Sequence, residues 1–389
     1  MGHDEAEPLL KGKFLKDFVA SSGDRDLAFL YCGIGDARNM YATMLAAATT
    51  TQKEVLEQLS ATKARVRSLH LTALDLKAPA LAKILIMFDL VDQYNLARHD
   101  ETQGTEKSIA QAMAYIYIGN FYPPVVHDMI QTSLARLIGL LERGERALPW
   151  VFIPEQSRAS IIRYLKQWKG PAVNAHDQKT ARRIFESIRN EENMMKQRMR
   201  FGNMPDRVPR GCEDDKIFID KLAILEPPKD FVSGDEPELR KFLDSVKSGA
   251  PSAVTSLDEY LSKHWKMNVT LLDMEWMSMF GDPKAPPTAR EEEIFSCLAI
   301  DAIQEVEHVT DKLAGLSMLS HKRASVIERF CYFFCQLADA IQELSPVMTV
   351  ELISGEVADV MEKLNYHCYD DRLQTFPTKF DRIHLSNIP

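Results

Sequence analysis

Short apolar runs that end in turn residues or acids alternate with helical patterns at the start of the chain. LAFLY (27–31) is a continuous apolar run that enters GIGD, which is typical of a buried strand ending in a glycine turn. A helical pattern follows from 38 to 48. LHLTALD (69–75) repeats the arrangement, ends in an acid, and precedes a helix that begins near Pro79. Two successive strand–helix units predict a right-handed crossover and a parallel sheet.

The pattern then becomes mostly helical until the end of the chain. Apolar residues keep helical spacing through 109–141, two helices are predicted within 154–200, and helices are predicted throughout 289–364. The stretch 201–236 is rich in Gly and Pro and indicates a domain boundary or a long functional loop. FDRIHL (380–385) returns to strand character.

We expect this last strand to join the two N-terminal strands. The predicted fold class is therefore α/β, with a Rossmann-like (methyltransferase-like) parallel sheet that is discontinuous in sequence and carries a large, mostly helical insertion. The expected parts are a Rossmann-like N-terminal part over 1–150, a helical basic segment and linker over 151–267, and a helical C-terminal part over 268–389 that returns a strand to the sheet.

The carboxyl ends of the predicted strands carry the candidate ligand-binding residues. Two glycines permit a tight turn, and amides at the start of the next helix can hold an anion. The GxGxxG dinucleotide pattern is incomplete, because it needs a glycine where Arg38 stands. Since ligands bind at this edge of parallel sheets, the expected substrate-binding residues are Gly33, Gly35, Arg38, Asn39, Asp75, Ser386 and Asn387.

Charge changes the picture in one region. The chain carries a net charge of −9, yet residues 158–210 contain thirteen Lys and Arg against five Asp and Glu. An acidic protein with one basic stretch is a candidate for a local polyanion contact, although a solvated helix face would give the same composition. The candidate nucleic-acid-binding residues are Arg163, Lys166, Lys169, Arg182, Arg183, Lys196, Arg198 and Arg200.

Other classes of protein are disfavoured by what the sequence lacks. No apolar run approaches the roughly 20 residues of a membrane-spanning helix, and the polar, acidic start MGHDEAEPLL is not a targeting peptide. The six cysteines form no CxxC or CxxH pair. We therefore expect a cytoplasmic protein with reduced thiols, no membrane contact, no bound cofactor and no metal site.

Several motifs resemble one known family. GxGDxRN (33–39), LHLTALDLKAPALAKILIM (69–87) and AYIYIGNFYPPVVHDMIQTSLARLI (114–138) resemble a fungal domain of unknown function. That domain is related to the N-terminal domain of an axonemal dynein assembly factor and often accompanies MYND zinc fingers. NVTLLDMEWMSMFGDP (268–283) and FDRIHLSNIP (380–389) resemble the C-terminal parts of the same proteins. This chain has no zinc-ligand cluster, so the finger's adaptor role does not carry over. The resemblance also implies further chain beyond Pro389.

Among stand-alone fungal proteins of this kind, the chain is similar to arginine-containing cyclodipeptide synthases. That resemblance implies arginyl-tRNA and a second aminoacyl-tRNA as substrates and a cyclo-Arg-Xaa diketopiperazine as product. NVTLL (268–272) is predicted to be a strand, which would point Asp273 and Glu275 to one side. These two carboxylates and Asp36 are the candidate catalytic residues, suited to binding a guanidinium or moving a proton from the attacking amine.

Alternatives stay open at this point. A protein nucleophile would be Cys32 or Ser386, but direct attack between two bound aminoacyl esters needs none. The GxG turn and Asp75 also suit an S-adenosylmethionine-dependent methyltransferase, in which an acid after the second strand accepts ribose hydroxyls. A non-catalytic interaction protein is the third reading, in line with the dynein-assembly relative.

Overall fold

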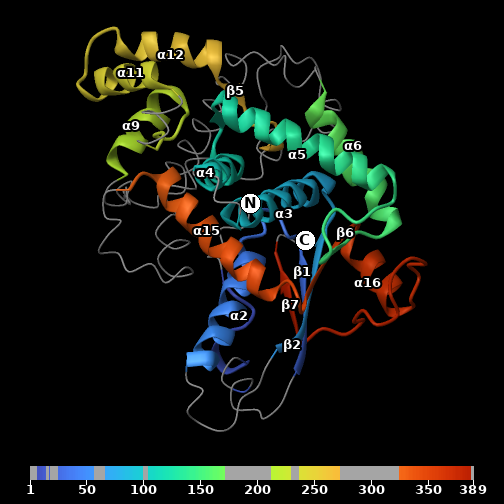
Figure 1. Cartoon of the computed structure of the whole chain (residues 1–389). Coiled ribbons are helices and arrows are strands. Elements are labelled where there is room, and N and C mark those ends of the chain that lie inside the picture. The colour runs from blue at the N-terminus through green and yellow to red at the C-terminus, as the bar shows by residue number, and fades with distance from the viewer. Residues whose placement is uncertain are drawn as a thin grey trace, which may run out of the picture. The chain divides into compact units, whose positions relative to one another are not determined.

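The structure is a computed structural model of the 389-residue chain (Figure 1), and it divides into two compact units. Unit 1 consists of Met1–Glu106, Ser133–Lys166 and Phe334–Pro389, and unit 2 of Lys107–Thr132 and Gln167–Phe333. The residues that the structure describes are 7–14, 17, 25–56, 66–99, 104–170, 212–228, 236–271 and 324–386.

Helices and strands follow one another along the described chain, and no described helix is both long enough and apolar enough to span a bilayer. The elements are β1 (Arg25–Cys32), α2 (Arg38–Leu56), β2 (Val66–Asp75), α3 (Ala78–His99), α4 (Thr105–Ile118), β3 (Phe121–Tyr122), α5 (Pro124–Glu142), β4 (Val151–Phe152), α6 (Glu155–Lys169), α9 (Glu213–Leu222), α11 (Pro237–Lys247), α12 (Ala253–His264), β5 (Lys266–Met267), the 3₁₀ helix η1 (Val269–Leu271), α15 (Val326–Leu344), β6 (Met348–Ser354), α16 (Val357–Asn365) and β7 (Arg382–Leu385).

Unit 1 is built on a five-stranded sheet in the order β4-β6-β2-β1-β7, and every pair in it is parallel. The chain moves outward from β1 to β2 and later to β6, and then returns to the other side of β1 as β7. The predicted α/β class and the discontinuous parallel sheet are therefore confirmed. Strands β2 and β6 are added on one side of β1, whereas β7 is added on the other side. Strands β1 and β7 therefore flank a topological switch point, where ligands bind in sheets of this type.

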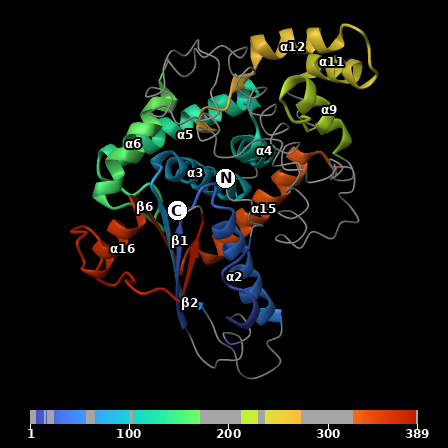
Figure 2. The same cartoon turned by 180° about the vertical axis from the view of Figure 1, so that it is seen from behind.

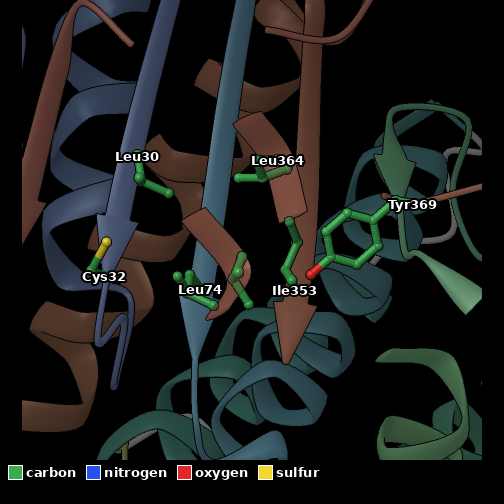
Figure 3. Packing of buried hydrophobic residues seen from close by; sticks show 7 residues of the cluster. Leu30, Cys32, Leu74, Ile353, Leu364 and Tyr369 are labelled. Atoms are coloured by element: carbon green, nitrogen blue, oxygen red, sulfur yellow. The ribbon is translucent and has the colours of Figure 1, made fainter. Parts of the chain in front are cut away.

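The two faces of the sheet are covered by different elements. On one face Leu30, Cys32, Leu74 and Ile353 form a buried apolar cluster with α16 and Tyr369 (Figure 3). We call this the α16 face, and α16 lies beside β6 in both Figure 1 and Figure 2. On the opposite face α2 contacts the sheet, as the hydrogen bond from Asn39 to His384 of β7 shows. Side chains alternate between these faces along each strand.

Unit 2 contains the short antiparallel pair β3–β5 and the amphipathic helices α9, α11 and α12. Among its described residues, Asn268 makes several buried hydrogen bonds. The Asn268 Nδ2 donates to the carbonyl oxygens of Tyr115, Ile116 and Gly119 at the end of α4, and its Oδ1 accepts the Thr270 amide. This side chain therefore satisfies carbonyls that the end of a helix leaves without partners.

Two secondary-structure predictions are wrong. The predicted strand over 268–272 is a 3₁₀ helix at Val269–Leu271, because the Asn268 side chain turns the backbone back toward the end of α4. The helices predicted throughout 289–364 are interrupted by β6, which pairs with β2 and β4 inside the sheet. Polar Thr349 and Glu351 break the apolar run in β6 that would have indicated a buried strand.

Candidate functional site

The carboxyl ends of β1 and β7 meet closely at the switch point. Gly33 directly follows β1, and a Cβ atom added there would overlap the carbonyl oxygen of Ser386, which follows β7. The Ser386 amide donates to the Cys32 carbonyl at 3.0 Å. Residues far apart in the chain are thus neighbours, as the sequence predicted for the glycine turn and Ser386. Asn387, predicted beside them, lies outside the described residues.

The backbone between β1 and α2 has an unusual conformation. In this glycine loop (residues 33–37) Gly33, Gly35 and Ala37 all have positive φ, of 71°, 53° and 63°. Ala37 is strained, because its Cβ disfavours the left-handed region, and its side chain is fully buried. The loop amides that donate within the protein are those of Gly33 and Ile34, to the Leu74 carbonyl, of Gly35, to Asp75, and of Ala37, to the Ile34 carbonyl, so the turn is not an open anion-binding site. Strain of this kind collects at binding sites.

Asp75, at the end of β2, organises this loop. Its Oδ2 accepts the Gly35 amide at 3.0 Å and its Oδ1 accepts the Lys77 amide at 2.8 Å. Burial raises the pKa of Asp75, and the two amide hydrogen bonds and the Lys77 charge oppose that rise. Both carboxylate oxygens thus join the glycine loop to the start of α3. A ribose-binding role, which the methyltransferase reading expects of Asp75, would have to share these oxygens.

Asp36 and Arg38 form a compact ion pair beside the loop. The Arg38 Nε donates to both Asp36 oxygens at 3.0 and 2.9 Å, and its Nη2 lies 2.6 Å from Oδ2. The Arg38 amide also donates to Asp36 at 3.2 Å. The side chain of Asp36 is 6% exposed and that of Arg38 15%. The structure therefore places a largely buried carboxylate and a guanidinium together at the carboxyl end of β1, where the sequence predicted them.

Asn39, a predicted substrate-binding residue, has hydrogen-bond partners within the protein. Its Nδ2 donates to Nε2 of His384 at 2.9 Å, and its Oδ1 accepts the Glu7 amide at 2.8 Å. Asn39 thus joins α2 to β7 and to the N-terminal segment (residues 7–14). His384 was not predicted to be a member of this cluster. The alternation in RIHL was the available signal, since it places Arg382 and His384 on the α2 face of β7.

Of the two candidate nucleophiles, Cys32 is disfavoured by its surroundings. It is 1% exposed and belongs to the apolar cluster of the α16 face. Burial raises the pKa of its thiol to about 11, so almost no thiolate is present at neutral pH. Ser386 lies at the switch point and is half-buried. Direct attack by the amine of one bound aminoacyl ester on the other ester needs no protein nucleophile.

The remaining predicted residues divide into described and undescribed groups. Arg163, Lys166 and Lys169 are all exposed and lie along α6 at spacings of three residues. Lys166 also pairs with Glu142 at 2.5 Å. The other predicted residues lie outside the described part of the chain: the cations Arg182, Arg183, Lys196, Arg198 and Arg200 and the carboxylates Asp273 and Glu275.

The described side chains give the site a definite chemical character. Among them no group of three or more His, Cys, Asp and Glu is arranged to hold a metal ion. The edge at β1, β2 and β7 carries a strained turn, a buried carboxylate beside a guanidinium, and a nearby imidazole. A carboxylate and a guanidinium suit a ligand with both a cationic and an anionic part. No family model, curated protein or solved structure matches this chain.

Proposed function

We propose that the sheet is Rossmann-like (methyltransferase-like) and that the chain is an aminoacyl-tRNA-dependent cyclodipeptide synthase joining arginine to a second amino acid. The observation that carries the proposal is the position of Asp36 and Arg38, on the GIGDARN motif, at the switch point of the sheet. The family resemblance supplies the reaction. The geometry supports a ligand site at the residues through which that resemblance runs.

The chemistry requires little of the protein beyond positioning. The α-amine of one aminoacyl group attacks the ester carbon of the other, an amide bond forms, and the ester bond to the first tRNA breaks. The unreacted α-amine of the dipeptidyl ester then attacks the remaining ester, which closes the ring and releases the second tRNA. Because each ester is already activated, orientation supplies most of the acceleration.

In this proposal Asp36 binds the α-ammonium group and takes one proton from it, which gives the attacking amine, and a second proton of that nitrogen passes to the tRNA oxygen as the ester bond breaks. Arg38 fixes the Asp36 carboxylate through the Nε and Nη2 contacts described above. Asp75 acts through the loop and is a positioning residue.

Mass spectrometry of small molecules from cells that express the chain tests the reaction. We expect a new arginine-containing cyclic dipeptide, lost in Asp36→Asn. Asp26→Asn is the matched control, because Asp26 also pairs with an arginine, Arg67, but is exposed at the opposite end of β1. Retained product in Asp36→Asn would discard the site, and no product from a folded chain supplied with both aminoacyl-tRNAs would discard the reaction.

A further inference from the structure

Strand β7 forms an edge of the described sheet and leaves apolar side chains uncovered. It pairs with β1 alone among the described strands. Ile383 and Leu385 are 47% and 62% exposed. Their register partners on β1, Leu30 and Cys32, are fully buried on the same α16 face. The apolar row of this face therefore continues onto β7 and is uncovered there.

Strand β7 lacks three protections that are common on edge strands: an outward-pointing lysine, a proline and a bulge. Natural edges carry outward-pointing lysines, prolines or bulges that prevent pairing with other chains. Within Arg382–Leu385 the only charged side chain is Arg382, and it turns into its own protein, where it donates to the Leu9 carbonyl at 3.0 Å and lies over the Phe14 ring. At the start of the strand, the Asp381 carboxylate accepts the Ala28 amide at 2.8 Å. Both charged side chains near this edge, Arg382 and Asp381, are thus bonded to groups of their own chain.

The two faces of β7 differ in how far the rest of the protein covers them. On the α2 face Arg382 and His384 are engaged by the N-terminal segment and by Asn39. That face is therefore occupied within the protein. On the α16 face Ile383 and Leu385 remain exposed, beside an edge whose outward backbone groups can add a strand. A partner must supply an edge strand with two apolar residues spaced by two.

We propose that this partner is a second copy of the chain, and that the two β7 strands pair antiparallel about a two-fold axis. Centring the pair on His384 places Ile383 of each copy opposite Leu385 of the other, on one common face. Arg382 then lies opposite Ser386, so no like charges meet. Shifting the register by one residue would oppose side chains that point to different faces. A two-fold contact of this kind is closed and does not propagate into fibres.

Sedimentation of the purified chain over a concentration series tests the proposal, which is independent of the proposed reaction. We expect a dimer that Leu385→Lys weakens about tenfold or more, because both symmetry-related apolar pairs are removed at once. Leu96→Lys is the control, since Leu96 on α3 is also 62% exposed and lies away from the edge. A monomer at all concentrations, or equal weakening by both variants, would overturn the proposal.

Cross-linking tests the register itself. Directly opposed residues of an antiparallel pair have Cβ atoms about 4.5–5.5 Å apart and diagonal ones about 7–8 Å. The double variant Ile383→Cys/Leu385→Cys should therefore form an intermolecular disulfide under mild oxidation. Leu385→Cys alone should not, because the two copies of that position lie on a diagonal. Both variants carry Cys32→Ser as well, because Cys32 is the register partner of position 385 on β1 and would compete for the introduced thiol. Equal cross-linking by the single and double variants would reject the antiparallel register.

Discussion

At the scale of single residues, Glu351 determines how one segment is held on the sheet. It is fully buried in β6, and Arg372 reaches it with two hydrogen bonds, Nε to Oε1 at 2.7 Å and Nη2 to Oε2 at 3.0 Å. His70 donates to the same carboxylate at 3.1 Å. Arg372 also donates to the Pro377 carbonyl at 2.7 Å. Through this pair the irregular segment 366–381 is fixed to the sheet.

The substitution Arg372→Ala should destabilise unit 1 by about 3–5 kcal/mol, because it leaves the Glu351 carboxylate buried without its main partner. Native-state hydrogen exchange of the β6 amides measures the destabilisation. The double variant Arg372→Ala/Glu351→Gln should recover part of it, since no buried charge remains. A double variant less stable than Arg372→Ala would show that the uncompensated charge is not the cause.

The same pair makes stability sensitive to acid. Burial alone would raise the pKa of Glu351, but the hydrogen bonds from His70 and Arg372 outweigh it and hold that pKa below its usual value of 4.5. The folded-state pKa is thus below the unfolded one. The stabilisation is fully present above about pH 4.5 and is lost as the pH falls through the folded-state value. The double variant should not show this acid dependence.

At the scale of elements, the packing of β1 against β7 depends more on Gly33 than on Gly35. Gly35→Ala should cost about 1–2 kcal/mol, because only its positive φ is strained and no other atom lies closer than 4.0 Å to the added Cβ. Gly33→Ala should cost more, since its Cβ would overlap the Ser386 carbonyl. Hydrogen exchange of the β7 amides separates the two variants. Equal protection in both would contradict the close packing.

Elements whose strand or helix signal is local could be predicted, and those that depend on distant partners could not. The strands β1, β2 and β7 and helices α2, α3 and α6 follow from apolar runs, caps and helical spacing. Strand β6 could not be found because Glu351 in its interior is acceptable only with Arg372 and His70 beside it. The segment at 268–272 was misassigned because Asn268 bonds α4, which is distant in the sequence.

At the scale of the whole molecule, the sheet that carries the site is assembled from three separate parts of the chain. The meeting of the glycine loop, Asp75 and Ser386 could be predicted, since parallel strands bring their carboxyl ends to one edge. The Asn39–His384 hydrogen bond and the hydrogen bond of Asp75 to the glycine loop could not be predicted, because side-chain partners depend on register. The sequence thus predicted which residues meet at this edge but not which of them bond to one another.

Charge is distributed over the whole molecule in a way that gives a final test of the tRNA proposal. The chain is acidic overall, whereas Arg163, Lys166 and Lys169 lie exposed along α6 within the basic stretch. If tRNA phosphates contact this helix, replacing all three by Ala should weaken tRNA binding. The slope of log affinity against log salt should then fall by about 0.7–0.9 for each phosphate that is no longer neutralised. A filter-binding series over salt measures both.

The matched control is Arg143→Ala/Arg146→Ala, which removes exposed arginines that precede β4. An unchanged slope in the α6 variant, or an equal reduction in the control, would remove α6 from the tRNA-binding surface.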